Sequence, residues 1–190
     1  TSAMSTMGYN AAMQAKKIIQ KDLSQVTIEV IDSRTVGPAQ LLLAVAAART
    51  AREGKNLGEI VELVNNLLPR IGEFEIADTL FYLDKGGGIF EAKSWAETQS
   101  LSSFRTVVEI DAISGGVAKP LARAKTKMQI IERVVDIAGE RVGGSKLYAA
   151  MVHTNVPDQA EQLREMILSR FQCNEFYICE ALAPTAIYNG

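Results

Sequence analysis

The chain has 190 residues, of which 47% are hydrophobic and 22% are charged. These proportions are those of a globular protein, and a chain of this length buries enough surface to fold without disulfides or metals. The formal net charge of -2 and the scattered basic residues argue against nucleic acid binding. The longest apolar run, residues 41–48, is too short to span a bilayer, and no signal-peptide pattern is present. We therefore expect a cytoplasmic protein without membrane insertion.

The first residues place several hydroxyl groups just ahead of an amphipathic helical pattern. Ser2, Ser5 and Thr6 belong to this stretch, and the apolar face of the helix follows. The N-terminus of a helix exposes unpaired N–H groups and the positive end of the helix dipole. Hydroxyl groups there either cap the backbone or turn toward an anion. We predict a ligand site at this stretch, with plain helix capping as the alternative, and we expect the natural protein to extend further toward its N-terminus.

The first 71 residues predict three helices, with one strand between the first and the second helix. Residues 26–31 are rich in β-branched side chains, which is typical of a short buried strand. A strand between helices favours a parallel sheet, whose ligands lie beyond the carboxyl ends of the strands, where Asp32 and Ser33 fall. The helix boundaries are predicted at Asp22 for the first helix, at Thr35, Gly37-Pro38 and Gly54 for the second, and at Asn56, Glu59 and Pro69 for the third.

The rest of the chain predicts a mixed sheet. Residues 74–83 contain an extended apolar run that stops at a glycine turn, Gly86, Gly87 and Gly88. Residues 104–110 and 117–119 flank a second turn as an antiparallel hairpin. The remaining elements are predicted as helices over residues 91–98, 126–142 and 157–171 and as strands over residues 146–152 and 175–181.

Together these elements indicate an α/β protein with two lobes. Residues 1–71 form a remnant of a parallel α/β lobe, and residues 72–190 form a mixed α/β lobe with a partly antiparallel sheet. Whether the second lobe is complete at its end is left open. The glycine turn lies near the seam, and clefts between lobes commonly enclose ligands. We therefore expect the ligand site between the lobes.

Four stretches of the sequence, in their order along the chain, resemble the DegV family. These stretches are residues 1–9, residues 30–33, residues 80–87, and Ser114-Gly115-Gly116 running on to Arg123-Ala124-Lys125. The resemblance implies a two-lobed DegV-like fold whose interlobe tunnel holds a long-chain fatty acid, with the carboxylate fixed by hydroxyl groups and a histidine. It also implies that such proteins present the acyl carboxylate to a fatty acid kinase without being catalysts. Family members usually carry a further N-terminal segment, which this chain lacks.

The resemblance also assigns roles to individual residues. Ser2 and Ser5 stand where the family has carboxylate-binding hydroxyls, and Thr6 lies beside them. The family's Gly-Gly-Arg reads Gly86-Gly87-Gly88 here, so the expected arginine is missing. Tyr188 stands where the family's histidine belongs. We predict lipid binding through these residues, and expect the lost arginine to weaken any handover of a phosphorylated headgroup; a plain tight turn is the alternative for the glycines.

Two other functions remain open for this sequence. One is a phosphotransferase subunit related to dihydroxyacetone kinases, with His153 as the residue to test, and the other is an interaction module without ligand. The sequence has neither a G-x-G-x-x-G nor a G-x-x-x-x-G-K-[ST] phosphate cradle and no G-x-S-x-G serine. We therefore expect a non-enzymatic binding protein, with no cofactor and no metal.

Overall fold

The computed structural model describes residues 2–3, 7–77, 79–82 and 104–182, which fall into two compact units. Unit 1 consists of Thr1–Glu73 and Ile110–Ala118, and unit 2 consists of Phe74–Glu109 and Lys119–Gly190. A short hairpin tip therefore belongs with the N-terminal unit although it lies far along the chain. The mixed α/β class predicted from the sequence is confirmed, because a parallel and an antiparallel strand pair are both present. The lobes at residues 1–71 and 72–190 stay a prediction.

Unit 1 contains three helices whose ends follow local sequence signals. They are α1 (Met7–Asp22), α2 (Gly37–Arg52) and α3 (Leu57–Leu67), and the short 3-10 helix η1 (Leu68–Arg70) follows α3. Asn56 and Glu59 form the predicted capping box: the Asn56 side chain accepts the Glu59 N–H at 3.1 Å, and the Glu59 carboxylate accepts the Asn56 N–H at 2.9 Å. These boundaries confirm the predicted helices.

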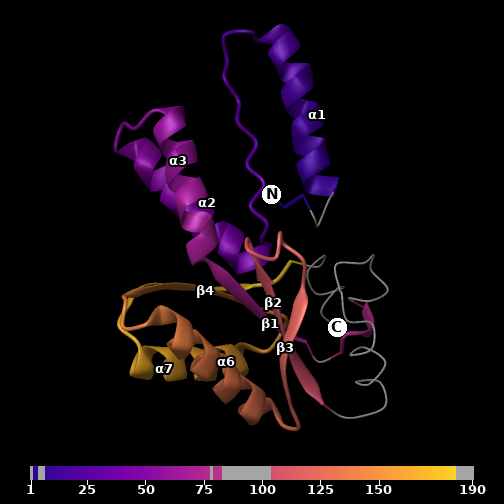
Figure 1. Ribbon diagram of the computed structural model, residues 1–190, viewed down its shortest axis with the longest axis vertical. Helices are drawn as coiled ribbons and strands as arrows, with labels where there is room; N and C mark the ends of the chain where they lie inside the picture. Colours follow the sequence, from indigo (N-terminus) through magenta and orange to yellow (C-terminus); the bar gives the residue numbers. More distant parts are fainter. Residues whose placement is uncertain (1, 4–6, 78, 83–103, 183–190) are drawn as a thin grey trace. The chain divides into compact units, whose positions relative to one another are not determined.

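The core of unit 1 lies where α2 and α3 pack side by side (Figure 1). Leu43 of α2, Val64 of α3 and Leu68 of η1 are buried there together with Ala112. Ala112 comes from the hairpin tip, so burial of apolar surface joins the tip to the two helices. The hairpin tip is thus part of the packed core of this unit.

The strand predicted over residues 26–31 is wrong. This segment has no strand structure, and Val26 is 42% exposed. A strand needs a neighbouring strand to satisfy its backbone N–H and C=O groups, and no strand among the described residues pairs with this segment. It runs back along α1 (Figure 1), and the Lys16 ammonium donates to the Glu29 carboxylate at 3.2 Å. The expected parallel sheet of the first lobe is therefore absent from the described part of unit 1.

A three-stranded sheet is ordered β1 (Gly72–Ala77), β2 (Arg105–Asp111), β3 (Lys119–Ala124). Strands β2 and β3 pair antiparallel, which confirms the predicted hairpin, and their register shifts between Val107 and Val108. The second strand, predicted over residues 117–119, instead runs over Lys119–Ala124. The extended run predicted to continue to residue 83 ends earlier, because Phe81 and Tyr82 are helical. In so short an apolar run, the pattern of side chains alone does not distinguish a strand from a helix.

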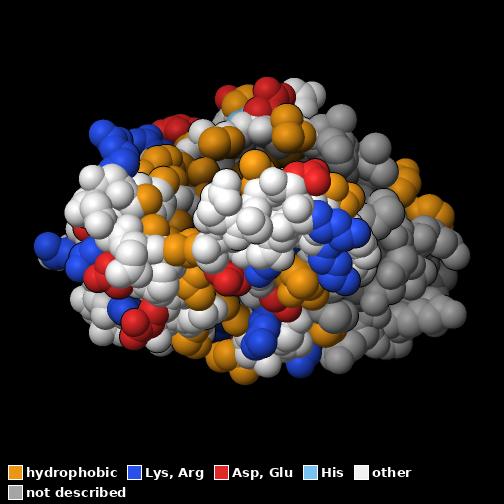
Figure 2. Space-filling model, turned by 90° about the horizontal axis from the view of Figure 1, so that it is seen from above, with side chains coloured by type: hydrophobic (Ala, Val, Ile, Leu, Met, Phe, Trp, Pro, Cys, Tyr) orange, Lys and Arg blue, Asp and Glu red, His pale blue; other side chains and the backbone are white. Residues whose placement is uncertain are grey.

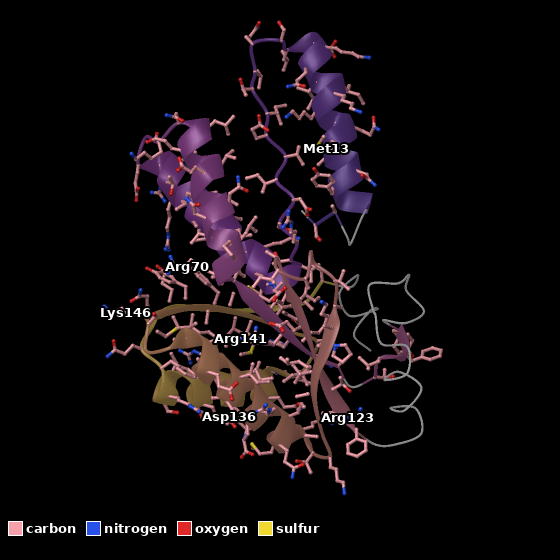
Figure 3. The ribbon with its side chains drawn as sticks, viewed as in Figure 1. Met13, Arg70, Arg123, Asp136, Arg141 and Lys146 are labelled. Atoms are coloured by element: carbon pink, nitrogen blue, oxygen red, sulfur yellow. The ribbon has the colours of Figure 1, made fainter. Side chains whose placement is uncertain are left out.

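Helix α6 (Lys127–Val142) covers the part of this sheet that lies in unit 2. Its Ile130 and Val134 are buried against Val107 of β2. Thr126 and Gln129 form a second capping box, and Gly143 ends the helix in a left-handed conformation. Arg141, labelled in Figure 3, pairs with Glu109 of β2, and its guanidinium lies 5.1 Å from the ring centre of Phe74.

The C-terminal part of unit 2 is a β-α-β unit. Strands β4 (Leu147–His153) and β5 (Cys173–Glu180) pair in parallel and are connected by α7 (Pro157–Arg170), which packs against β4 and α6. The Arg170 guanidinium lies 2.5 Å from the carboxylate of Asp136, also labelled in Figure 3, which ties α7 to α6. These elements confirm the predicted strand, helix and strand. The helix predicted over residues 91–98 lies outside the described residues.

The hairpin tip between β2 and β3 is fixed by its own hydrogen bonds. The Ser114 N–H donates to Asp111 Oδ1 at 2.6 Å, and the Gly116 N–H donates to the Asp111 carbonyl at 2.8 Å. Gly115 and Gly116 both have positive φ, at 73° and 85°. A Cβ atom on Gly116 would lie 3.0 Å from the Arg34 carbonyl oxygen, whereas one on Gly115 would meet nothing within 4 Å. Gly116 therefore lets the tip approach the backbone of residue 34.

Replacing Gly116 by alanine tests this close approach. Gly116→Ala should lower the free energy of unfolding by about 2 kcal/mol, because it adds a clash with the Arg34 backbone to the strain of a left-handed alanine. Gly115→Ala is the matched control and should lower it by about 1 kcal/mol, since only the backbone strain applies there. Chemical denaturation measures both; equal losses would contradict the close approach.

Candidate functional site

The predicted ligand site is described at one position, Ser2. This serine is buried, with 3% of its surface exposed, although it lies almost at the start of the chain. The other predicted site residues lie outside the described residues, and their roles stay predictions: Ser5, Thr6, Gly86, Gly87, Gly88 and Tyr188. The site is therefore described from Ser2 and from the residues of unit 1 around Asp32, which contacts the neighbouring Ala3.

Asp32 holds the segment that contains Ser2. The Ala3 N–H donates to Asp32 Oδ1 at 2.8 Å, and the same oxygen accepts the Arg34 N–H at 3.2 Å. Hydrogen bonds to an ionised carboxylate are shorter and stronger than neutral ones. The structure thus brings together two stretches that the sequence analysis singled out separately, the N-terminal hydroxyls and Asp32-Ser33. The Asp32 carboxylate joins these stretches by accepting backbone hydrogen bonds.

Two further hydroxyl side chains are buried in the loop after Asp32. The Ser33 hydroxyl donates to the Thr35 carbonyl oxygen at 3.1 Å, and Ser33 is buried. Thr35 is fully buried, and its Oγ1 has no hydrogen-bond partner among the residues that the structure describes. The sequence analysis treated Thr35 only as a helix start.

The N-terminus of α2 is already capped by a carboxylate of the protein. Glu73 of β1 is buried, and its Oε2 accepts the Val36 N–H at 2.9 Å. A negative charge at this end of a helix is stabilised by the helix dipole. A Cβ atom on Gly37 would lie 3.3 Å from Glu73 Oε1, so glycine suits this position. An anionic ligand has little place at α2, because Glu73 occupies that role.

Arg34 places a positive charge within this loop. Its backbone is left-handed, with φ at 51°, which is uncommon for a residue other than glycine. The Arg34 Nε lies 3.9 Å from Asp32 Oδ2, and its Nη1 donates to the Ala112 carbonyl at 3.4 Å. The side chain is 51% exposed. Sequence reasoning did not select Arg34, because only the fold brings the hairpin tip to it.

The described part of unit 1 has several hydrogen-bond donors near Ser2, and His153 lies in unit 2. Near the start of α2, the described part of unit 1 has buried hydroxyl side chains and the half-exposed Arg34 guanidinium, which are groups that can donate to a polar or anionic group. His153, the residue considered for phosphoryl transfer, lies at the end of β4 in unit 2, and its Nδ1 is buried without a hydrogen-bond partner among the described residues. A base that activates a nucleophile must lie within hydrogen-bond reach of it, and His153 shows no such pairing in the described chain.

One hollow on the described surface does not suit a lipid. A hollow of about 430 Å³ lies on one helix, α7, and its lining is acidic or amide: Asp158, Gln159, Glu161, Gln162 and Glu165. Such a lining does not suit an acyl chain, since ligand pockets for apolar molecules are mostly apolar. On the face shown in Figure 2, acidic and basic side chains are interspersed. Among the described helices, none combines the length and the apolar character needed to cross a bilayer.

The fold and the site define a mixed α/β protein with a buried N-terminal serine segment and no assembled catalytic group in its described part. The chain belongs to the DegV family: the family model, whose description reads "Uncharacterised protein, DegV family", matches residues 1–190. A DegV domain-containing protein of Streptococcus pyogenes serotype M1 is 27% identical over 161 residues, which cover 85% of this chain and 54% of that protein. The chain thus spans about half the length of the curated relatives that it matches.

Solved structures share the fold. A DegV family protein from Eubacterium eligens loaded with heptadecanoic acid has a TM-score of 0.89 at 18% identity, covering 100% of this chain and 67% of that chain. The Streptococcus pneumoniae fatty acid kinase (Fak) B3 protein loaded with linoleic acid has a TM-score of 0.80 at 21% identity, covering 96% of this chain and 63% of that chain. At these identities the likeness establishes the DegV fold.

The buried Thr35 hydroxyl provides a stability test. Thr35→Val keeps the shape of the side chain and removes a polar group that has no partner among the described residues. Burying an unsatisfied hydroxyl is unfavourable, so the valine variant should raise the free energy of unfolding by about 1 kcal/mol. Thr35→Ser is the control because it retains the hydroxyl. Destabilisation by valine in ligand-free protein would show that the hydroxyl has a structural partner.

Proposed function

We propose that the protein binds a long-chain fatty acid, with the carboxylate at the hydroxyl stretch that begins at Ser2. The observation that carries this proposal is the burial of Ser2 beside the Ala3–Asp32 hydrogen bond, which holds residues 2 and 3 against the loop that contains Asp32. Support also comes from the solved structures of the same fold that are loaded with heptadecanoic acid and linoleic acid. The acyl tail lies in an interlobe tunnel to which residues 86–88 and Tyr188 contribute.

The tail supplies most of the affinity in this proposal. Each buried methylene contributes about 0.8 kcal/mol, whereas a hydrogen bond to a charged group contributes about 1.5 to 3 kcal/mol. The family's arginine is Gly88 here, so one charged contact to the headgroup is lost. A long tail offsets such a loss. Binding is therefore retained even though the headgroup contacts are reduced.

The protein serves as a carrier and not as an enzyme. A fatty acid kinase is the proposed partner that receives the acyl carboxylate, and the support is the likeness to the Streptococcus pneumoniae fatty acid kinase B3 protein. Gly88 and Tyr188 stand where the family has an arginine and a histidine. The loss of the arginine weakens the handover of an acyl phosphate more than it weakens the binding of the fatty acid. No nucleic acid partner and no membrane insertion belong to this function.

Extraction of the purified chain with organic solvent, followed by mass spectrometry, tests the proposal. We expect long-chain fatty acids in the extract. In binding assays with saturated acids, the affinity should rise by about fourfold for each added methylene until the tunnel is full. A chain that neither carries nor takes up any long-chain acid would contradict the proposal.

A pair of serine variants locates the headgroup within the same assay. Ser2→Ala should lower the affinity for the acid by at least about tenfold, since one hydrogen bond to a carboxylate, which contributes about 1.5 to 3 kcal/mol, is removed. Ser24→Ala is the matched control, because Ser24 is exposed in the turn after α1 and its hydroxyl contacts the neighbouring Gln25 side chain. Equal effects of the two substitutions would place the headgroup elsewhere.

A further inference from the structure

One carboxylate in unit 1 connects Arg34 to the start of the chain. Asp32 Oδ1 accepts both the Ala3 N–H at 2.8 Å and the Arg34 N–H at 3.2 Å, and Asp32 Oδ2 lies 3.9 Å from the Arg34 guanidinium. Ser2 precedes Ala3 directly and is buried. The side chain of Arg34 thus lies against the same carboxylate that holds the Ser2 segment.

The charge of Asp32 poses a problem for an anionic ligand at Ser2. Two carboxylates a few ångströms apart repel each other, and the repulsion grows as water is excluded. The other acidic groups of this region, Glu73 and Asp111, already accept the backbone N–H groups of Val36 and Ser114. They add negative charge and provide no compensation for it. A ligand carboxylate therefore needs a nearby cation.

The fold holds Arg34 in a defined place. Its left-handed backbone has φ at 51°, and the hairpin tip supports it from one side, where a Cβ atom on Gly116 would lie only 3.0 Å from the Arg34 carbonyl oxygen. The Ala112 carbonyl accepts a hydrogen bond from its guanidinium. Half of the side chain remains exposed, and a guanidinium has five N–H donors. Arg34 is thus positioned by contacts far along the chain and still accessible.

We infer that Arg34 neutralises Asp32 and thereby allows the N-terminal hydroxyl stretch to accept the carboxylate of a fatty acid. This inference rests on the proposed function and adds to it a charge-compensating residue. Arg34 supplies, from the loop ahead of α2, positive charge that Gly88 does not provide. Its role is to position and compensate charge, so it affects acids and leaves neutral lipids of the same length unaffected.

Binding of hexadecanoic acid and of hexadecan-1-ol to the full chain tests this role. Arg34→Gln should weaken acid binding by about tenfold and leave alcohol binding within about twofold, because only the acid carries the charge that Arg34 compensates. Arg34→Asn serves as a second variant, since asparagine tolerates the left-handed backbone. Arg52→Gln is the matched control: Arg52 ends α2, roughly 22 Å along the helix from its start, and should change neither affinity.

The double variant Asp32→Asn with Arg34→Gln is the sharper test. Asparagine retains an oxygen that accepts the Ala3 N–H, but it removes the charge that Arg34 compensates. Acid affinity should then return to within about threefold of the wild type. Loss of acid and alcohol binding together, no loss for acid, or no recovery in the double variant would each overturn the role of Arg34. A wild-type chain that binds neither ligand would instead overturn the proposed function, and this inference with it.

Discussion

The hydrogen bonds that Asp32 accepts are the contacts on which the N-terminal region depends. One carboxylate oxygen accepts N–H groups from Ala3 and Arg34, so it fixes the start of the chain against the loop ahead of α2. Glu73 does the same for the start of α2, through the Val36 N–H. Both carboxylates satisfy backbone donors that would otherwise be unpaired, which is a strong requirement for buried backbone.

The hairpin tip extends this arrangement into the core of unit 1. Gly116 approaches the backbone of Arg34, while Ala112 is buried with Leu43 and Leu68 beneath it. The same short segment therefore positions the guanidinium on one side and contributes to helix packing on the other. A change at the tip is consequently expected to alter both the stability of the unit and the position of the Arg34 guanidinium beside Asp32.

Local signals made most of the helices and their ends predictable. The capping boxes at Asn56 and Thr126 and the left-handed Gly143 depend on residues within a single turn, so the sequence contains all of the needed information. Local signals were not enough to predict whether residues 26–31 form a strand. Its β-branched residues favour extended backbone, but strand formation depends on a pairing partner elsewhere in the fold.

In the candidate site, too, some residues could be predicted from the local sequence and others could not. Ser2 could be selected from the density of hydroxyls ahead of a helix, and the family resemblance supported that choice. Arg34 and Glu73 could not, because their contacts join residues far apart in sequence: Glu73 reaches Val36 across 37 positions, and Arg34 reaches Ala112 across 78. Neither contact has a local pattern. Only the folded chain shows that Ala3 and the Arg34 guanidinium lie against the same carboxylate, that of Asp32.

The central claim is that a fatty acid carboxylate lies at the N-terminal hydroxyl stretch beside Arg34. A crystal structure of the chain with hexadecanoic acid tests it most directly. We predict electron density for the carboxylate within about 3.2 Å of the hydroxyl of Ser2 or Ser5, and closer to the Arg34 guanidinium than to the Asp32 carboxylate. Density for the headgroup against other residues, with water alone at Ser2 and Ser5, would contradict it.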